Sequence, residues 1–164
     1  MEQESYENTV REITKIVLTS PQKMIRKEDI VNLSRGFDFE KIISDVYRNL
    51  TKVGFEFISS NFLGHKYYIL TSEGKDDRIS PSQYGTLAFI LTLSKEIDED
   101  LKIDDMKEVF NEVWASDVEF LIENDYLREI EKYGIIKVTP LGKAVLKNII
   151  SDLNLNDLLE SFKI

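Results

Sequence analysis

A chain of 164 residues with no cysteine and a single histidine excludes a disulfide framework and a thiolate metal site, and it leaves almost no basis for a histidine-based catalytic triad. No segment approaches the roughly 18 apolar residues that cross a bilayer, and the first residues lack the basic and apolar regions of a signal peptide. We therefore expect an intracellular protein without a membrane partner.

The net charge of −9 is unevenly distributed between the two halves of the chain. Residues 1–78 contain 12 Lys and Arg against 13 Asp and Glu, whereas residues 79–164 contain 9 against 17. An acidic surface repels the phosphate backbone of nucleic acid. Any nucleic-acid contact is therefore expected in the first half. The simplest explanation of the acidic second half is that its charge keeps the protein surface soluble.

The first half has the element order of a winged helix, three helices followed by a β-hairpin. Apolar spacing predicts helices over residues 6–18, 27–34 and 39–53, the last of them capped by Asp38. Aromatic and β-branched residues predict strands at 55–59 and 66–71, joined by a loop at 61–64. The side chains expected to face the core of these helices are Tyr6, Val10, Ile13, Val17, Leu18, Ile30, Val31, Leu33, Phe39, Ile42, Ile43, Val46, Tyr47, Leu50 and Val53.

The second half repeats this order. Ser80 and Pro81 open a helix that runs to about Lys95 and is apolar nearly all round. A second helix is expected at 104–113, with Met106, Val109, Phe110 and Val113 inward, and a capping box at Ser116–Glu119 opens a third. Strands follow at 127–131 and 135–139, then helices at 143–151 and 154–162. The sequence thus predicts an α+β, mostly helical fold of tandem winged-helix domains, with boundaries at 1–78 and 79–164.

Catalytic chemistry has little support. His65 lies alone in the predicted hairpin loop, and the acidic residues of 98–105 lack the spacing of a calcium loop. The chain has no phosphate-binding loop, dinucleotide fingerprint or nucleophile elbow. We expect no catalytic residues, no metal site and no cofactor. An enzyme with a carboxylate site is the most remote of the three functional classes considered.

Basic residues of the first half are candidate contacts to double-stranded DNA. Several lie off the apolar face of the third helix, which in a winged helix enters the major groove, although Asp38, Glu40 and Asp45 dilute this patch. The corresponding helix of the second half carries Asp117, Glu119, Glu123, Asn124 and Asp125, a face that suits a protein partner better. The candidate DNA-binding residues are Arg26, Lys27, Lys41, Arg48, Lys52 and Lys66.

The first helix is a second candidate contact surface. Ile16, Val17 and Leu18 are contiguous, so they cannot all point into one core. At least one of them is expected at a surface, where it is available to a partner. Packing against the second half of the chain is the alternative explanation.

The first half also resembles the MAGE homology domain. The resemblance rests on Ile13–Leu18, the segment Ile25-Arg26-Lys27-Glu28-Asp29-Ile30, and the wing segments Val53–Phe57 and Tyr67–Leu70. In the second half, Ser80–Leu87 resembles the start of the family's second winged helix. The resemblance covers most of the chain in order.

This resemblance implies a kite protein, a kleisin-interacting tandem winged-helix subunit of an SMC complex. Such a subunit binds a kleisin and a second kite subunit, as a hetero- or homodimer, and is chromosome-associated, in the nucleus of a eukaryote or the nucleoid of a prokaryote. Family members hold a RING-type partner with an apolar pair that falls on Val17 and Leu18, where valine replaces the usual first leucine. The alternative function is a winged-helix transcriptional regulator that binds DNA.

Overall fold

The computed structural model describes residues 1–72 and 78–147, and the chain divides into two compact units, Met1–Gly74 and Lys75–Ile164. The helix predicted at 154–162 and the end of the one predicted at 143–151 lie outside the described residues. Within the described part, no helix has the length and hydropathy of a membrane span.

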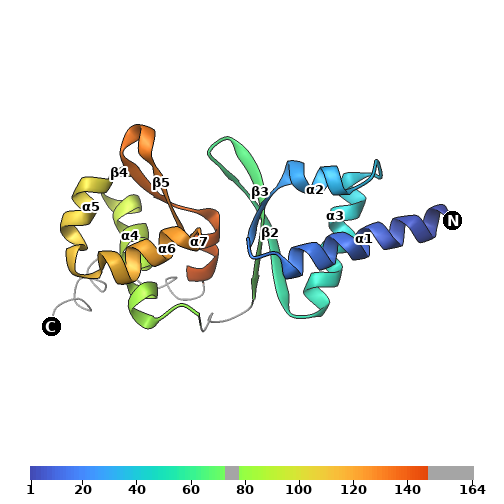
Figure 1. The fold of residues 1–164 in the computed structure, drawn as a ribbon, viewed down its shortest axis with the longest axis horizontal. Coiled ribbons are helices and arrows are strands. Elements are labelled where there is room, and N and C mark those ends of the chain that lie inside the picture. Colours follow the sequence, from blue (N-terminus) through green and yellow to red (C-terminus); the bar gives the residue numbers. More distant parts are fainter. Residues whose placement is uncertain (73–77, 148–164) are drawn as a thin grey trace. The chain divides into compact units, whose positions relative to one another are not determined.

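The first unit is a winged helix with a three-stranded antiparallel sheet. The strand order is β1-β3-β2, and Figure 1 shows the three helices on one side of the β2–β3 hairpin. Asp38 caps α3 as predicted, since its carboxylate accepts a hydrogen bond from the Glu40 amide at 3.1 Å. The elements are α1 (Glu2–Thr19), β1 (Met24–Arg26), α2 (Lys27–Leu33), α3 (Phe39–Lys52), β2 (Phe55–Phe62) and β3 (His65–Ser72).

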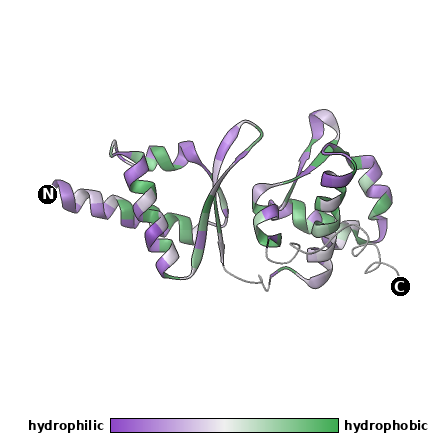
Figure 2. Ribbon diagram, turned by 180° about the vertical axis from the view of Figure 1, so that it is seen from behind, coloured by the Kyte–Doolittle hydropathy of each residue, from purple (hydrophilic) through white to green (hydrophobic). Residues whose placement is uncertain are grey.

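The core of this unit lies between the helices and one face of the sheet. Figure 2 shows α1 hydrophilic near the N-terminus and more hydrophobic toward its other end, and the buried side chains of this helix are Tyr6, Thr9, Val10, Ile13 and Val17. Phe57 and Tyr68 stack on the sheet side with ring centroids 5.3 Å apart. The buried core residues are Tyr6, Val10, Ile13, Val17, Ile30, Ile42, Val46, Leu50, Phe57, Tyr68 and Leu70.

Four residues predicted to be inward are exposed instead, namely Val31, Leu33, Tyr47 and Val53. Helix α2 has only seven residues, so its inward face has room for Ile30 alone. Tyr47 lies beyond the edge of the α3 face that carries Ile42, Val46 and Leu50. Val53 is the C-cap, after which the backbone turns at Gly54.

Strand β1 was not predicted from the sequence. Met24–Arg26 is too short to show an alternating pattern, and it forms a strand only because it pairs with β3, with Ile25 opposite Tyr68. The β2–β3 hairpin is also longer than expected. Its turn consists of Leu63 and Gly64 alone, because Phe62 and His65 are still paired.

The second unit repeats the winged-helix order, with strand order β4-β6-β5. Ser80 and Gln83 form a reciprocal capping box at the start of α4, and nine side chains of this helix are buried, as its apolar composition predicted. Its elements are α4 (Pro81–Glu96), β4 (Leu101–Lys102), α5 (Ile103–Val109), the 3₁₀ turn η1 (Asn111–Val113), the π-helical turn η2 (Trp114–Val118), α6 (Glu119–Glu123), β5 (Leu127–Ile130), the 3₁₀ turn η3 (Glu131–Tyr133), β6 (Ile135–Val138) and α7 (Pro140–Leu146).

Three sequence predictions for this unit are wrong in detail. Val109 is exposed, because α5 ends there and the chain continues into η1. Ser116 does not cap a helix, since it lies within the π-helical turn. Helix α7 begins at Pro140 instead of residue 143, with Thr139 as its N-cap. The Thr139 hydroxyl accepts a hydrogen bond from the Gly142 amide at 3.0 Å.

Asp117 is a buried carboxylate and not part of an exposed acidic face. Its side chain is 3% exposed and accepts hydrogen bonds from the hydroxyls of Ser82 at 2.6 Å and Thr86 at 2.8 Å, both on α4. The Ser116 hydroxyl donates a third bond at 3.1 Å. Charge-assisted bonds of this kind are about twice as strong as neutral ones. Asp117 therefore fastens the irregular η2 turn to α4.

We predict that Asp117→Ala lowers the free energy of unfolding by about 2–4 kcal/mol, because the hydroxyls of Ser82 and Thr86 lose their buried acceptor. Urea unfolding of the full chain measures this change. Glu119→Ala is the matched control, since Glu119 is an exposed acid two residues away, and its effect is expected within about 0.5 kcal/mol. Equal unfolding curves for the two variants would refute this role of Asp117.

Candidate nucleic-acid interface

The outward face of α3 is the main candidate for contact with nucleic acid. Its exposed side chains recur every three or four residues along the helix, and they include three cations and one acid. Tyr47 lies among them and is 49% exposed. These exposed residues are Glu40, Lys41, Ser44, Tyr47, Arg48, Thr51 and Lys52, and they are called the α3 face below.

Contacts with Tyr6 of α1 and with Asp45 of α3 itself hold two of the three cations on the α3 face. The Lys41 ammonium lies 4.5 Å from the centre of the Tyr6 ring, and Arg48 forms an ion pair with Asp45 at 3.0 Å. The Tyr6 hydroxyl donates a hydrogen bond to the same Asp45 carboxylate. Burial, reinforced by this bond, raises the pKa of Tyr6 to about 12. The charge of Asp45, which the sequence predicted would dilute the basic patch, is thus largely neutralised by Arg48 and Tyr6.

A hollow between α1 and α3 extends this basic surface. Arg11 of α1 lines it together with Arg48 and Lys52 of α3, and Asn49 lies between them, donating a 3.4 Å hydrogen bond to Thr14. Sequence reasoning missed Arg11, because α1 was examined only for its apolar side. Tyr47 was missed because helical spacing placed it inward. The remaining residues that line the hollow are Tyr6, Glu7, Val10 and Asp45.

The other three predicted DNA contacts lie around the wing and not on the α3 face. The ammonium of Lys27 lies 5.2 Å from the Phe39 ring, and that of Lys66 lies 5.7 Å from the Tyr68 ring. The Phe39 and Tyr68 rings are themselves 6.0 Å apart, so these two lysines flank one aromatic pair. Lys27 and Lys66 therefore lie close to one aromatic pair, whereas Lys41, Arg48 and Lys52 lie along α3.

Arg26 is directed to a different aromatic ring. It is paired with Tyr67 across β1 and β3, and Tyr67 points to the opposite side of the sheet from Tyr68. The Arg26 Nε donates to the Tyr67 hydroxyl at 3.4 Å, and this bond raises the pKa of the guanidinium above its already high usual value. Arg26 is cationic with or without this bond. It differs from Lys27 and Lys66 in where it lies, because it contacts Tyr67 and they flank the Phe39–Tyr68 pair.

The candidate partner residues of α1 are not equivalent. Ile16 is 43% exposed, whereas Val17 is 1% exposed and lies in the core, and Leu18 is half-buried against it. Val17 is therefore not a surface contact, because its side chain packs inside the core. Ile16, with the exposed edge of Leu18, remains the candidate.

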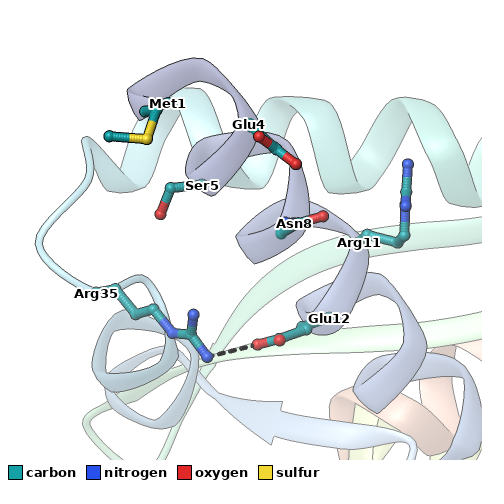
Figure 3. A pocket seen from close by; sticks show the side chains of 7 residues that line it. All are labelled: Met1, Glu4, Ser5, Asn8, Arg11, Glu12 and Arg35. Atoms are coloured by element: carbon teal, nitrogen blue, oxygen red, sulfur yellow. Dashed lines mark hydrogen bonds and ion pairs between the residues drawn. The ribbon is translucent and has the colours of Figure 1, made fainter.

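A second hollow, beside the N-terminal half of α1, has mixed charge. Figure 3 shows Arg35 reaching Glu12, with which it forms a 2.8 Å ion pair, while Arg11 is directed away from that pair. The other residues that line it are Met1, Glu4, Ser5 and Asn8, a set without a nucleophile and base in contact. Across residues 1–72 and 78–147, no three His, Cys, Asp or Glu side chains gather closely enough to hold a metal ion.

The helix of the second unit that corresponds to α3 remains acidic, but less so than predicted. Glu119 and Glu123 are exposed on α6, whereas Asp117 is buried as described above. Asp125 forms an ion pair with Arg128 at 2.8 Å, so its charge is largely balanced. Two glutamates therefore remain to repel a phosphate backbone.

Comparison with known proteins decides the fold. No protein-family model and no curated protein matches the sequence. Among solved structures, a chain of the Nse1-Nse3-Nse4 complex superposes with a TM-score of 0.58 over 88% of this chain and 73% of that one, at 11% sequence identity. The two chains share one fold. The tandem winged-helix architecture and the resemblance to MAGE-type kite proteins are thereby confirmed at the level of fold.

Proposed function

We propose that this chain is a non-catalytic, MAGE-like kite subunit of an SMC chromosome-maintenance or DNA-repair complex, where it binds a kleisin and a second kite subunit. The observation that carries this proposal is the likeness over 88% of the chain to a chain of the Nse1-Nse3-Nse4 complex. A match over 88% of the chain includes both winged helices. A match to a single winged helix would say less, because many unrelated DNA-binding proteins contain one.

Weak, sequence-independent contact with double-stranded DNA is the second part of the proposal. The α3 face supports it, since it carries Lys41, Arg48 and Lys52 against one exposed acid. Each cation that neutralises a phosphate releases counterions, so the affinity falls steeply with salt. The overall charge of −9 keeps this affinity low.

Two exposed regions support protein partners. In the first unit, Ile16 presents an apolar side chain to solvent beside the half-buried Leu18. In the second unit, Glu119 and Glu123 on α6 suit a basic segment of a partner better than a nucleic acid. These regions belong to different units, which is consistent with a subunit that holds more than one partner.

Affinity purification from the source cell, followed by mass spectrometry, tests the proposal. We expect the tagged chain to recover an SMC ATPase, a kleisin and a second tandem winged-helix protein. Ile16→Glu is expected to lose at least one of these proteins, because it places a charge on the exposed apolar contact. Val31→Glu is the matched control, since Val31 is exposed to a similar extent, 41% against 43%.

The alternative, a transcriptional regulator, makes the opposite prediction. It requires tight, sequence-selective binding to a short duplex, which appears as a discrete footprint. A subunit of the proposed kind protects no defined sequence. Recovery of neither an SMC ATPase nor a kleisin, together with a discrete footprint, would favour the regulator.

A further inference from the structure

The hollow between α1 and α3 collects positive charge from two helices. Its volume of about 340 Å³ lies within the usual range of small-ligand sites, about 300–1,000 Å³. Arg11 lines it from α1, and Arg48 and Lys52, which are one turn apart, line it from α3. Cations along a single helix suit an extended ligand, whereas cations of two helices around one hollow suit a single compact anion.

The two carboxylates that line the hollow are already engaged. Asp45 accepts a hydrogen bond from the Tyr6 hydroxyl and pairs with Arg48 at 3.0 Å. Glu7 accepts a hydrogen bond from the Gln3 side-chain amide at 3.3 Å, on the same helix. Three cations against two carboxylates leave a net positive charge in the lining.

Three side chains of the lining keep hydrogen-bond donors for a ligand. Arg11 and Lys52 are both exposed, and neither forms an ion pair with a residue in the described part of the chain. Asn49 is half-buried, and its side-chain amide donates one N–H to the Thr14 hydroxyl at 3.4 Å. The second N–H of that amide remains available, because a primary amide has two donors.

A phosphate monoester has the charge and the acceptors that match these donors. It carries about −1.5 to −2 charges at pH 7 and three strongly accepting oxygens, and arginine clusters recur in sites that bind it. A DNA backbone phosphate is a diester with a single negative charge, so it brings less charge to one hollow. The only apolar surface in the lining comes from Tyr6 and Val10, which offer little to the rest of a nucleotide. The hollow therefore suits a phosphoryl group whose further contacts are made by a larger molecule.

We propose that the hollow between α1 and α3 binds the phosphorylated side chain of a serine or threonine in a partner protein. Arg11, Lys52 and the Asn49 amide donate to its three free oxygens, while Arg48 stays paired with Asp45 and adds positive charge. The partner segment is then held only in its phosphorylated form. This inference goes beyond the subunit role proposed above and does not depend on contact with DNA.

Nuclear magnetic resonance of the isotopically labelled full chain tests this site. The probe is the capped tripeptide acetyl-Ala-phosphoserine-Ala-amide, and the comparisons are its unphosphorylated form, dimethyl phosphate as a diester, and inorganic phosphate. We expect the phosphopeptide to shift the side-chain signals of Arg11 and Asn49 in a saturable manner. The unphosphorylated peptide and the diester should bind at least about tenfold more weakly, and inorganic phosphate no more tightly than the phosphopeptide.

Arg11→Gln is expected to weaken phosphopeptide binding about tenfold, because it removes one charged donor. Lys15→Gln is the matched control, since Lys15 is an exposed cation of the same helix that does not line the hollow. It loses the same charge and should bind the phosphopeptide as the wild type does. Circular dichroism of both variants should match the wild-type spectrum, because both side chains are exposed.

Four results would overturn the proposal. The first is the absence of saturable shifts with the phosphopeptide. The second is wild-type binding by Arg11→Gln, or a loss equal to that of Lys15→Gln, which would leave only a general effect of charge. The third is a preference of about tenfold for inorganic phosphate, which would make the hollow a site for the free ion. The fourth is a duplex DNA that shifts the Arg11 signal where the phosphopeptide does not, which would assign the hollow to the DNA contact.

Discussion

Reversing the charge of Lys41, Arg48 and Lys52 together to Glu is expected to reduce the affinity for duplex DNA at least about 100-fold, which abolishes binding at physiological salt. The three cations lie along the exposed α3 face, from which each can reach a phosphate. Loss of three phosphate contacts lowers the slope of log affinity against log salt by about three. Fluorescence anisotropy over a salt series measures both quantities.

The control must carry the same change in net charge. Lys95, Lys102 and Lys132 are exposed lysines of the second unit, so their triple change to Glu makes the chain equally acidic without touching the α3 face. Near wild-type binding is expected for this control. Equal loss in both triple variants would show that net charge alone governs binding, and retained binding in the first would show that the site is elsewhere.

Folding of the first variant has to be verified, because Glu at position 48 would face the Asp45 carboxylate with which Arg48 now pairs at 3.0 Å. The triple change to Gln avoids this repulsion and still removes the three positive charges. It is expected to weaken binding to a smaller extent with an unchanged circular dichroism spectrum. The Gln variant therefore separates a binding defect from a folding defect.

Replacing Gly142 by Ala is expected to lower the free energy of unfolding by about 3 kcal/mol or more. A Cβ at this position would lie 2.3 Å from the Tyr126 carbonyl oxygen and 3.0 Å from Val138 Cγ1. The carbonyl cannot easily move, because it accepts a hydrogen bond from the Thr139 amide at 3.1 Å. Urea unfolding of the full chain measures the change.

The direction of this effect distinguishes packing from helix propensity. Gly142 lies inside α7, where propensity alone would make alanine the more stable residue by about 1 kcal/mol. Gly36→Ala is the control, since a Cβ there meets nothing within 4 Å and costs only the strain of its positive φ. A neutral or stabilising Gly142→Ala would contradict the close approach of α7 to the backbone of Tyr126.

The sequence predicted the order of elements because each depends on local signals. Asp38 and Ser80 act as caps through hydrogen bonds within three residues, and Gly134 ends the second hairpin's turn with a positive φ. Apolar spacing was equally informative for α3 and α4, which each run for at least 14 residues. Such signals do not depend on the rest of the fold.

The details that depend on distant residues were not predictable. Strand β1 exists only through its pairing with β3, and Asp117 is buried only because two hydroxyls of α4 meet it. From its neighbours in sequence, Asp117 was predicted to belong to an exposed acidic face. Tyr47 likewise has helical spacing that suits the core, yet it is exposed, beyond the α3 face that buries Ile42, Val46 and Leu50.

The candidate site was therefore predicted only in part. Basic residues on α3 are visible in the sequence, and their exposure follows from the position of the apolar stripe. That Arg11 joins Arg48 and Lys52 around one hollow requires the packing of α1 on α3. Of Ile16, Val17 and Leu18, the sequence showed that at least one must be exposed, and only the fold shows that it is Ile16.

The mass of the complex that contains this chain tests the central claim most directly. Native mass spectrometry of the tagged, affinity-purified chain is expected to show it bound to one kleisin and to a second tandem winged-helix subunit. A homodimer of the chain that carries a short duplex and neither of these proteins would contradict the account.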